Sequence, residues 1–414
     1  MAKTKKYLQF GIMQKIYQGS GAISTIPSIL ETEGWKRVML VADPGLYKAG
    51  VIEPIEKLLR ETPGVEYTVF TNVRPNPEAV TIDNEAIPQF RDFKGEVMVA
   101  VGGGSTLDTA KGVALVGDSG KKVMDFIGID PHKPLPQKNY PIIAVPTTAG
   151  TGSEVCRNAV ICDENGYKLV PSHECILPTY AVLDPDLLAG LPFSIAAATA
   201  MDTFTHALES YTNPNANDFT MLFSLRSLEL VGEAIRPFVA NPAEDESAEK
   251  MSLACMYAGF SLGIASIGQD HVITHPMSED PFHMPHGDAC GMALPATIEY
   301  NAMGCKERYR KAYNALTKKN VSEGDFDVQM LIDWVMDLNY DLNIAQRKTF
   351  EEWGYNDNDV LDLMMSHPIF DNKDAMKNED CWFPRVSHKK EFRQLIQRIN
   401  EYTKIARERD LNRK

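Results

Sequence analysis

The chain has 414 residues, 44% of them hydrophobic and 24% charged, which is the balance of a soluble globular protein with two or three domains. Its 42 basic and 56 acidic residues give a formal net charge of -14, which disfavours nucleic acid and anionic membranes as partners. We find no secretory signal at the N-terminus and no apolar run near the ~20 residues of a membrane span. Seven cysteines without CxxC spacing favour free thiols, so we expect a cytoplasmic protein.

Up to about residue 186, short apolar runs alternate with helix-like segments. The runs predict strands over residues 38–42, 67–70, 97–101 and 142–145. Their continuous apolar character is typical of strands buried on both faces of a parallel sheet. Helices are predicted between them, at 52–60 and 106–116. The alternation predicts an α/β N-terminal Rossmann-like domain over residues 1–186.

From residue 187 the pattern changes to long segments with apolar residues every three or four positions. These predict helices over residues 195–211, 219–239, 248–267 and 328–342. Two X-Pro steps at 184–185 and 191–192 interrupt the chain at the join. We therefore expect an all-α C-terminal domain over residues 187–414, with a polar surface loop at 371–380.

Three glycines follow the predicted strand at 97–101 and precede a predicted helix. Gly102, Gly103 and Gly104 would let backbone N–H groups approach a pyrophosphate at the helix N-terminus. Ser105, with Asp108 three residues later, resembles a capping box. The spacing is not GxGxxG, and a tight structural turn explains it equally well.

A second loop of small and hydroxyl residues, PTTAGTGSE (146–154), follows the predicted strand at 142–145. Thr147, Thr148 and Thr151 are its candidate contacts to phosphate or ribose. The carboxyl ends of parallel strands meet at one edge of a sheet, where α/β domains bind ligands. Two such loops in one domain favour a nucleotide site over an ordinary Gly/Thr turn.

Two single charged residues have simpler alternatives. Asp43 ends a predicted strand, where a carboxylate accepts hydrogen bonds from adenosine ribose and repels a 2′-phosphate. It also opens an Asp-Pro-Gly step, which is typical of a helix cap. Lys168 follows a turn and would reach ribose or phosphate, or simply be solvated.

Four of the nine histidines lie between residues 271 and 286. With an earlier Asp-x3-His pair, the candidate metal ligands are Asp202, His206, His271, His275, His283 and His286. Spacing by four places Asp202 with His206, and His271 with His275, on one face of a helix each. We expect the last two histidines to lie in a proline-rich loop.

These ligand types suit Fe(II) or Zn(II), although a single helical histidine is often an ordinary core or surface residue. Spacing alone leaves open which of the six bind. A metal beside phosphate-binding loops, without a Ser-His-Asp or Cys-His nucleophile, favours redox chemistry.

Four motifs in the correct order resemble the iron-containing (group III) alcohol dehydrogenase family. They are GGGSTLDTAK (102–111), PTTAGTGSE (146–154), MDTFTHALE (201–209) and H-x3-HP…PHG (271–287). The resemblance implies the dehydroquinate synthase-like architecture of that family. It also implies hydride transfer between NAD(H) and a small primary alcohol or aldehyde, in a homodimer or larger homo-oligomer.

The resemblance also implies roles for single residues. It assigns a metal, Fe(II) with Zn possible, to Asp202, His206, His271 and His286. It places His275 beside the nicotinamide and the substrate as a candidate proton relay. It assigns Asp43 to the preference for NAD over NADP. The remaining NAD contacts that it implies are Gly103, Gly104, Ser105, Thr147, Thr148, Thr151 and Lys168.

Two segments depart from the family pattern. The stretch from His271 to His286 is one residue longer, and residues 277–281 replace a small Gly-Ala stretch. This segment is expected to border the substrate pocket or to form a surface bulge. Residues 381–385 replace a shorter Asn-Pro-Arg segment, and the charged tail to Lys414 is expected to form an oligomer contact or a solvated helix.

Two other functions remain open. One is a lyase resembling dehydroquinate synthase, whose phosphate substrate calls for clustered Lys or Arg, and residues 271–287 contain neither. The other is a non-enzymatic sensor of metal and nucleotide.

Overall fold

One parallel sheet organises the N-terminal half of the protein. The computed structural model describes residues 14–136, 140–279, 282–344, 348–367, 383–385 and 389–413. The sheet has six strands in the order β1-β8-β5-β4-β2-β3. Their bounds are β1 Lys15–Gln18, β2 Arg37–Ala42, β3 Glu66–Phe70, β4 Val97–Gly102, β5 Ile142–Pro146 and β8 Tyr180–Leu183.

The four predicted strands correspond to β2, β3, β4 and β5 and are confirmed. Sequence patterning missed β1 and β8, which are only four residues long. Strand β1 is also polar at both ends, because it lies at the edge of the sheet. A short antiparallel hairpin, β6 (Ile161–Cys162) and β7 (Lys168–Leu169), stands apart from the sheet.

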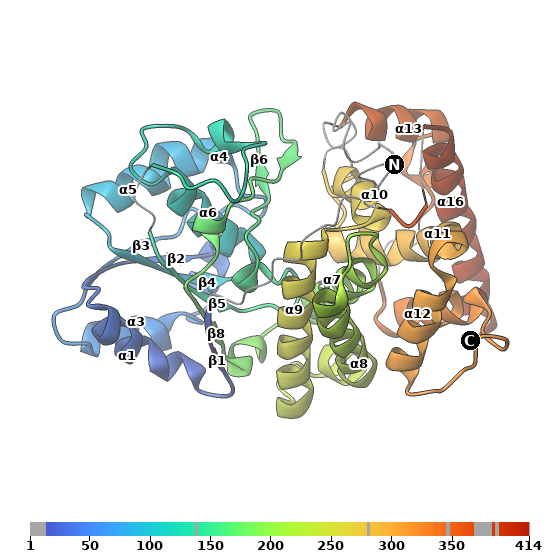
Figure 1. Ribbon diagram of the computed structural model, residues 1–414, viewed down its shortest axis with the longest axis horizontal. Helices are drawn as coiled ribbons and strands as arrows, with labels where there is room; N and C mark the ends of the chain where they lie inside the picture. Colours follow the sequence, from blue (N-terminus) through green and yellow to red (C-terminus); the bar gives the residue numbers. More distant parts are fainter. Residues whose placement is uncertain are drawn as a thin grey trace, which may run out of the picture.

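Helices cover both faces of the sheet, as Figure 1 shows. Helices α1 (Ile26–Glu33) and α3 (Glu53–Glu61) lie on one face, and α5 (Ile87–Asp92) and α6 (Gly104–Val116) lie on the other. Each face has its own apolar core, because strands with side chains pointing both ways need cover on both sides. The predicted doubly wound α/β fold is confirmed.

The C-terminal half is helical and lies beside the sheet (Figure 1). Its long helices are α7 Phe193–Thr212, α8 Asp218–Ala240, α9 Asp245–Ala265, α10 Gln269–Met277, α11 His286–Thr317, α12 Val328–Asp341, α13 Asp357–Ser366 and α16 Lys389–Asn412. They share one large apolar core, which confirms the predicted all-α architecture. In the described parts of the chain no single helix is long and apolar enough to cross a membrane; only α9 and α10 together reach that composition, and they meet at 103°.

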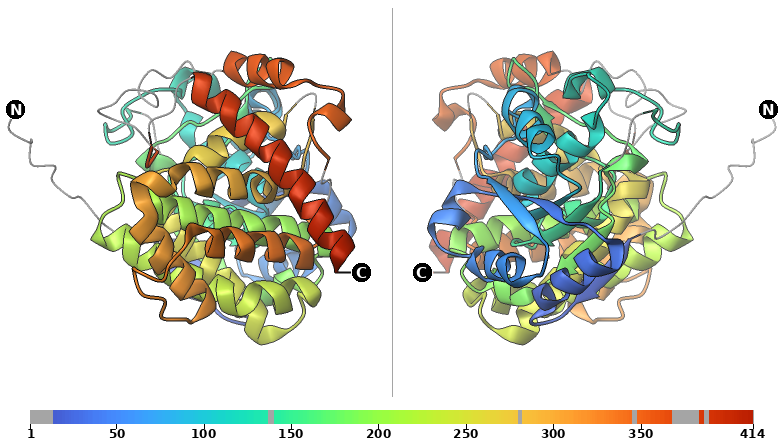
Figure 2. Two further views of the ribbon diagram at one scale, coloured as in Figure 1. Left: turned by 90° about the vertical axis from the view of Figure 1, so that its right-hand side faces the viewer. Right: turned by 90° about the vertical axis from the view of Figure 1, so that its left-hand side faces the viewer.

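The C-terminal helix α16 crosses the helical layer diagonally (Figure 2, left). It packs on α11 and α13 and buries Phe392, Leu395, Ile396 and Ile399. The interpretation of the tail as a solvated helix is therefore wrong. Before it, Phe383 packs against Phe392, while Cys381, Trp382 and the predicted loop at 371–380 lie outside the described residues.

Candidate active site

The two predicted phosphate loops lie against each other at the carboxyl ends of β4 and β5. The N–H of the buried Thr147 donates to the carbonyl at the end of β4 (3.1 Å). A Cβ atom at Gly104 would lie 2.6 Å from Thr151 Cγ2, and one at Gly103 would lie 3.3 Å from Thr148. Glycine is needed at position 104 because any side chain would push the loops apart.

The predicted capping box at Ser105 and Asp108 is wrong. Helix α6 begins at Gly104, and its N-cap is Gly103, which offers no side-chain cap. The Ser105 hydroxyl donates to the carbonyl of Pro75 instead. The N–H groups of Thr106 and Leu107 donate to the carbonyl of Gly103. The N–H groups of Gly104 and Ser105 are therefore the ones that the first turn of α6 can offer to an anion, and no side chain caps this helix end.

A buried charged network that the sequence analysis missed ties α6 to the second loop. The ammonium group of Lys111 is fully buried and donates to Ser153 Oγ (2.6 Å) and to the carbonyl of Asn158 (2.6 Å). Ser153 Oγ in turn donates to Asp108 Oδ1 (2.7 Å), which lies 3.9 Å from Lys111 Nζ. This network explains the Asp and Lys of the GGGSTLDTAK motif. Next to it, burial raises the pKa of Glu154 to about 7.

Asp43 caps a helix at the carboxyl end of β2. Its Oδ1 accepts hydrogen bonds from the N–H groups of Gly45 (2.7 Å) and Leu46 (3.0 Å) at the start of α2 (Pro44–Lys48). Asp43 therefore acts as a helix cap in this structure, and its contact with adenosine ribose stays a prediction.

A buried carboxylate oxygen lies among three imidazoles. Asp202 Oδ1 is 3.6 Å from His206 Nε2, 3.4 Å from His271 Nε2 and 3.7 Å from His286 Nε2. Asp202 and His206 are on α7, His271 is on α10 and His286 is on α11. His286 is the first residue of α11, so its placement in a loop is wrong. Ligand atoms about 2.0–2.1 Å from one tetrahedral ion lie roughly 3.3 Å apart, close to these distances.

The donor atoms of this cluster fit a divalent cation. Asp202 Oδ1 and His271 Nε2 are buried and have no hydrogen-bond partner among the described residues. Buried polar atoms are nearly always paired, so two facing orphans are unusual in a packed core. The Nδ1 atom of His206 lies 3.3 Å from the carbonyl of Gly150, which directs the lone pair of Nε2 toward Asp202.

Glu209 holds the imidazole of His271, and the sequence analysis did not single it out. His271 Nδ1 lies 2.5 Å from Glu209 Oε2, while the N–H groups of Gly268 (2.9 Å) and Asp270 (2.6 Å) donate to the same carboxylate. Burial lowers the pKa of His271, but the carboxylates of Glu209 and Asp202 outweigh burial and raise it to about 10. A carboxylate that orients a histidine in this way is typical of metal sites. The spacing Asp-x3-His-x2-Glu was the available signal.

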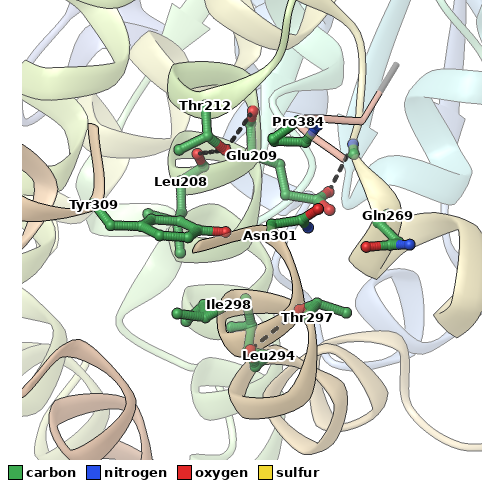
Figure 3. Close-up of a pocket in the computed structure, with 11 residues that line it drawn as sticks. Leu208, Glu209, Thr212, Gln269, Leu294, Thr297, Ile298, Asn301, Tyr309 and Pro384 are labelled. Carbon is green, nitrogen blue, oxygen red and sulfur yellow. Dashed lines mark hydrogen bonds between the residues drawn. The ribbon is translucent and has the colours of Figure 1, made fainter. Parts of the chain in front are cut away.

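A small cavity lies behind Glu209, as Figure 3 shows. Its polar lining includes Glu209, Thr212, Thr297, Asn301 and Tyr309, from α7 and α11. Buried polar cavities favour ordered water. Such water would solvate Glu209 and Asn301, whose buried Oδ1 has no partner in the described part of the chain.

His275 lies one turn after His271 on α10, as predicted. Its ring centroid is 5.4 Å from that of His286, and its buried Nδ1 has no hydrogen-bond partner among the described residues. Burial holds the pKa of His275 well below its usual value, so the imidazole is neutral. His283, in contrast, is exposed in the connecting loop.

Met277 and Ser278 are buried and the side chain of Glu279 is largely covered, so the surface-bulge interpretation is wrong for the described part of the 277–281 segment. Glu279, only 9% exposed, accepts from the N–H of Lys168 (3.0 Å) and lies 3.1 Å from His367 Nε2. Ser278 Oγ lies 3.2 Å from His286 Nδ1, so this segment also orients a histidine of the cluster. Residues 280 and 281 lie outside the described residues.

Lys168 is not a solvated surface residue. Its side chain is buried on β7, and burial lowers its pKa while the carboxylate of Glu279 opposes the shift. The hairpin thus brings a buried ammonium group from the N-terminal half near the cluster of the helical half.

Two glycine- and threonine-rich loops adjoin at the edge of a parallel sheet, beside helices that carry a carboxylate and three imidazoles. This arrangement is the one expected of a metal-dependent oxidoreductase of the dinucleotide-binding type. Two family models match the chain: "Iron-containing alcohol dehydrogenase" over residues 13–185 and "Fe-containing alcohol dehydrogenase family, C-terminal" over residues 196–383. The chain belongs to the iron-containing alcohol dehydrogenase family.

Individual relatives agree with this assignment. The chain is 32% identical over 404 residues to choline dehydrogenase of Bacillus subtilis, covering 96% of each chain. It is 34% identical over 295 residues to 1,3-propanediol dehydrogenase of Klebsiella pneumoniae, covering 70% of this chain and 74% of the relative. The structure of sulfoacetaldehyde reductase from Bifidobacterium kashiwanohense in complex with NAD+ matches with a TM-score of 0.81 and 25% identity, over 95% of this chain and 99% of that one.

The protein is therefore an NAD-linked, metal-dependent oxidoreductase of alcohols and aldehydes. This assignment favours the oxidoreductase over the lyase and over the non-enzymatic sensor.

Proposed function

We propose that the chain transfers a hydride between NAD(H) and a small primary alcohol or aldehyde, next to a divalent metal, Fe(II) or Zn(II), held by Asp202, His206, His271 and His286. The observation that carries the proposal is the buried carboxylate oxygen Asp202 Oδ1, which has no hydrogen-bond partner among the described residues and lies 3.4–3.7 Å from the Nε2 atoms of three imidazoles. A cation bound among these atoms would satisfy the buried Asp202 Oδ1 and His271 Nε2, which make no hydrogen bond to a described residue.

The bound metal would supply Lewis acidity that lowers the pKa of an alcohol and polarises an aldehyde carbonyl. Asp202 brings the negative charge that offsets the cation, and Glu209 and Ser278 fix the rings of His271 and His286. His275, whose buried Nδ1 has no hydrogen-bond partner among the described residues, would relay the alcohol proton to water.

The edge of the sheet would bind NAD. Gly103, Gly104 and Ser105 offer backbone N–H groups at the start of α6 to the pyrophosphate. Thr147, Thr148 and Thr151 border it from the second loop. On the ribose side we place Lys168 and Asp43. The NAD+ complex of the structural relative supports this cofactor.

Two variants and one control test the site. His271→Ala and His286→Ala should lose bound metal and NADH-linked turnover, because each removes one ligand. His283→Ala is the matched control, since His283 is in the same segment but exposed. We would measure metal content by mass spectrometry, and NADH absorbance against aldehydes and alcohols that include choline and 1,3-propanediol. Full metal content and activity in both ligand variants would overturn the assignment.

We further propose a domain boundary at residues 186/187, between the ranges of the two family models. We also propose a cytoplasmic homodimer or larger homo-oligomer. Size-exclusion chromatography with light scattering measures the mass of the protein in solution. A mass of 46.1 kDa, which is that of one chain, would contradict the proposed oligomer.

A further inference from the structure

A cysteine faces the proposed metal site from α11. Cys290 is four residues after His286, and its side chain is fully buried. Its Sγ lies 3.9 Å from His286 Nε2, the same nitrogen that faces Asp202. Sγ also lies 3.6 Å from Thr274 Oγ1, its neighbour on α10.

The sulfur belongs to a compact group of possible ligand atoms. One atom each from Asp202, His271, His286 and Cys290 lies within 4.8 Å of all the others. Two of these residues, Asp202 and His271, carry the buried atoms without a hydrogen-bond partner described above, Oδ1 and Nε2. Asp202 Oδ1 and His271 Nε2, neither of which has a hydrogen-bond partner among the described residues, therefore border the same space as the thiol.

The distance between Cys290 Sγ and His286 Nε2 fits an ion that both atoms contact. With a Zn–S distance of about 2.3 Å and a Zn–N distance of about 2.0 Å, tetrahedral ligands lie roughly 3.5 Å apart, near the observed 3.9 Å between Sγ and Nε2. His206 lies outside this group, although its Nε2 is 3.6 Å from Asp202. The residues present can thus form a set of five ligands, and catalytic zinc sites expand to five-coordinate geometry.

We propose that Cys290 is a thiolate ligand of the metal held by Asp202, His271 and His286, and that it makes the site prefer Zn(II) over Fe(II). The proposal rests on the metal site of the proposed function. On binding, the S–H bond breaks, the metal–sulfur bond forms and the proton is released to solvent. A thiolate is a soft ligand, and added to imidazoles it favours zinc.

X-ray absorption at the zinc edge of the wild-type protein tests ligation without any substitution. We expect a sulfur scatterer at about 2.3 Å beside nitrogen and oxygen scatterers. A zinc-loaded protein with nitrogen and oxygen only would overturn the thiolate ligand while leaving the proposed function intact. A protein that binds no zinc, cobalt or iron would instead contradict the proposed function, and this proposal with it.

Cobalt loading of Cys290→Ser gives the second measurement. Wild-type protein with Co(II) should show near-ultraviolet thiolate-to-cobalt charge-transfer absorption, and C290S should lose it and bind zinc about ten-fold more weakly or worse. Cys305→Ser is the matched control, because Cys305 is buried on the same helix and a hydroxyl can keep its hydrogen bond to the Asn301 carbonyl. An unchanged absorption band in C290S would overturn the proposal.

Discussion

The two loops after β4 and β5 and the cluster around Asp202 bury polar groups in opposite ways. Where α6 meets the second loop, Lys111, Asp108 and Ser153 satisfy one another, and glycine brings the two loop backbones together. In the cluster, Asp202 Oδ1 and His271 Nε2 are buried and make no hydrogen bond to a described residue. The difference teaches that internal pairing shapes the loops, whereas the cluster keeps buried atoms without hydrogen bonds that suit the proposed cation.

Breaking the internal pairing of the loops should have the largest effect on stability. Lys111→Met leaves the buried carboxylate of Asp108 without its cation, so we expect a loss of about 3–5 kcal/mol in the free energy of unfolding. Urea unfolding measures this free energy. The control is Lys36→Met, at an exposed position, which should change the free energy of unfolding by less than about 0.5 kcal/mol. Equal stability of both variants would mean that the network does not hold the loops.

The pH dependence of stability tests the same region at Glu154. Burial raises its pKa from 4.5 to about 7 in the folded chain, so the carboxyl group binds a proton more tightly there than in the unfolded chain. The contribution of the protonated Glu154 to the free energy of unfolding is complete below about pH 4.5 and is lost as pH rises through about 7. Relative to Glu154→Gln, the wild type should lose up to about 3 kcal/mol of stability between pH 5 and pH 8. Parallel pH profiles of the two proteins would contradict this.

In the metal cluster, the expected effect falls on metal affinity. Glu209→Gln removes the charge that orients His271, and we expect metal to bind about 10–100-fold more weakly. Equilibrium dialysis with Zn(II) measures the affinity. The control is Glu246→Gln, whose exposed ion pair with Lys250 contributes little. Unchanged affinity in E209Q would show that Glu209 is only a structural partner.

The smallest effect on stability is expected from a substitution at Asp43. The same substitution distinguishes a helix-capping role of Asp43 from a contact with the adenosine ribose. Asn caps helices about as well as Asp, so Asp43→Asn should change stability by less than about 0.5 kcal/mol. If the carboxylate also faces the adenosine ribose, the ratio of NADPH to NADH use should rise. Steady-state kinetics with both cofactors measures this ratio, and an unchanged ratio would remove Asp43 from the nucleotide site.

Much of the fold was predictable because its signals are local. Buried strands such as β4 and amphipathic helices such as α8 carry their periodicity within a few residues. The exceptions have physical reasons. Strand β1 is short and lies at an edge, and α16 carries a strongly polar sequence around one narrow buried stripe.

The sequence predicted which residues could form the candidate site, but not the contacts between them. Asp202, His206, His271 and His286 could be proposed from their spacing and from a family resemblance, whereas Glu209, Ser278 and Glu279 could not be assigned partners. The partners lie far away along the chain: Glu209 meets His271 across 62 positions, and Glu279 meets His367 across 88.

By itself the sequence determined the alternation of strands and helices, the two loops after β4 and β5 and the types of ligand available. Only the tertiary structure decided that Asp202 lies among three imidazoles, that Lys168 and Glu279 are buried together, and that Cys290 faces the same space. The physical reason is that periodicity and turn chemistry act over a few residues, whereas these contacts depend on how α7, α10 and α11 pack. Helix packing is set by the whole core, and no local pattern encodes it.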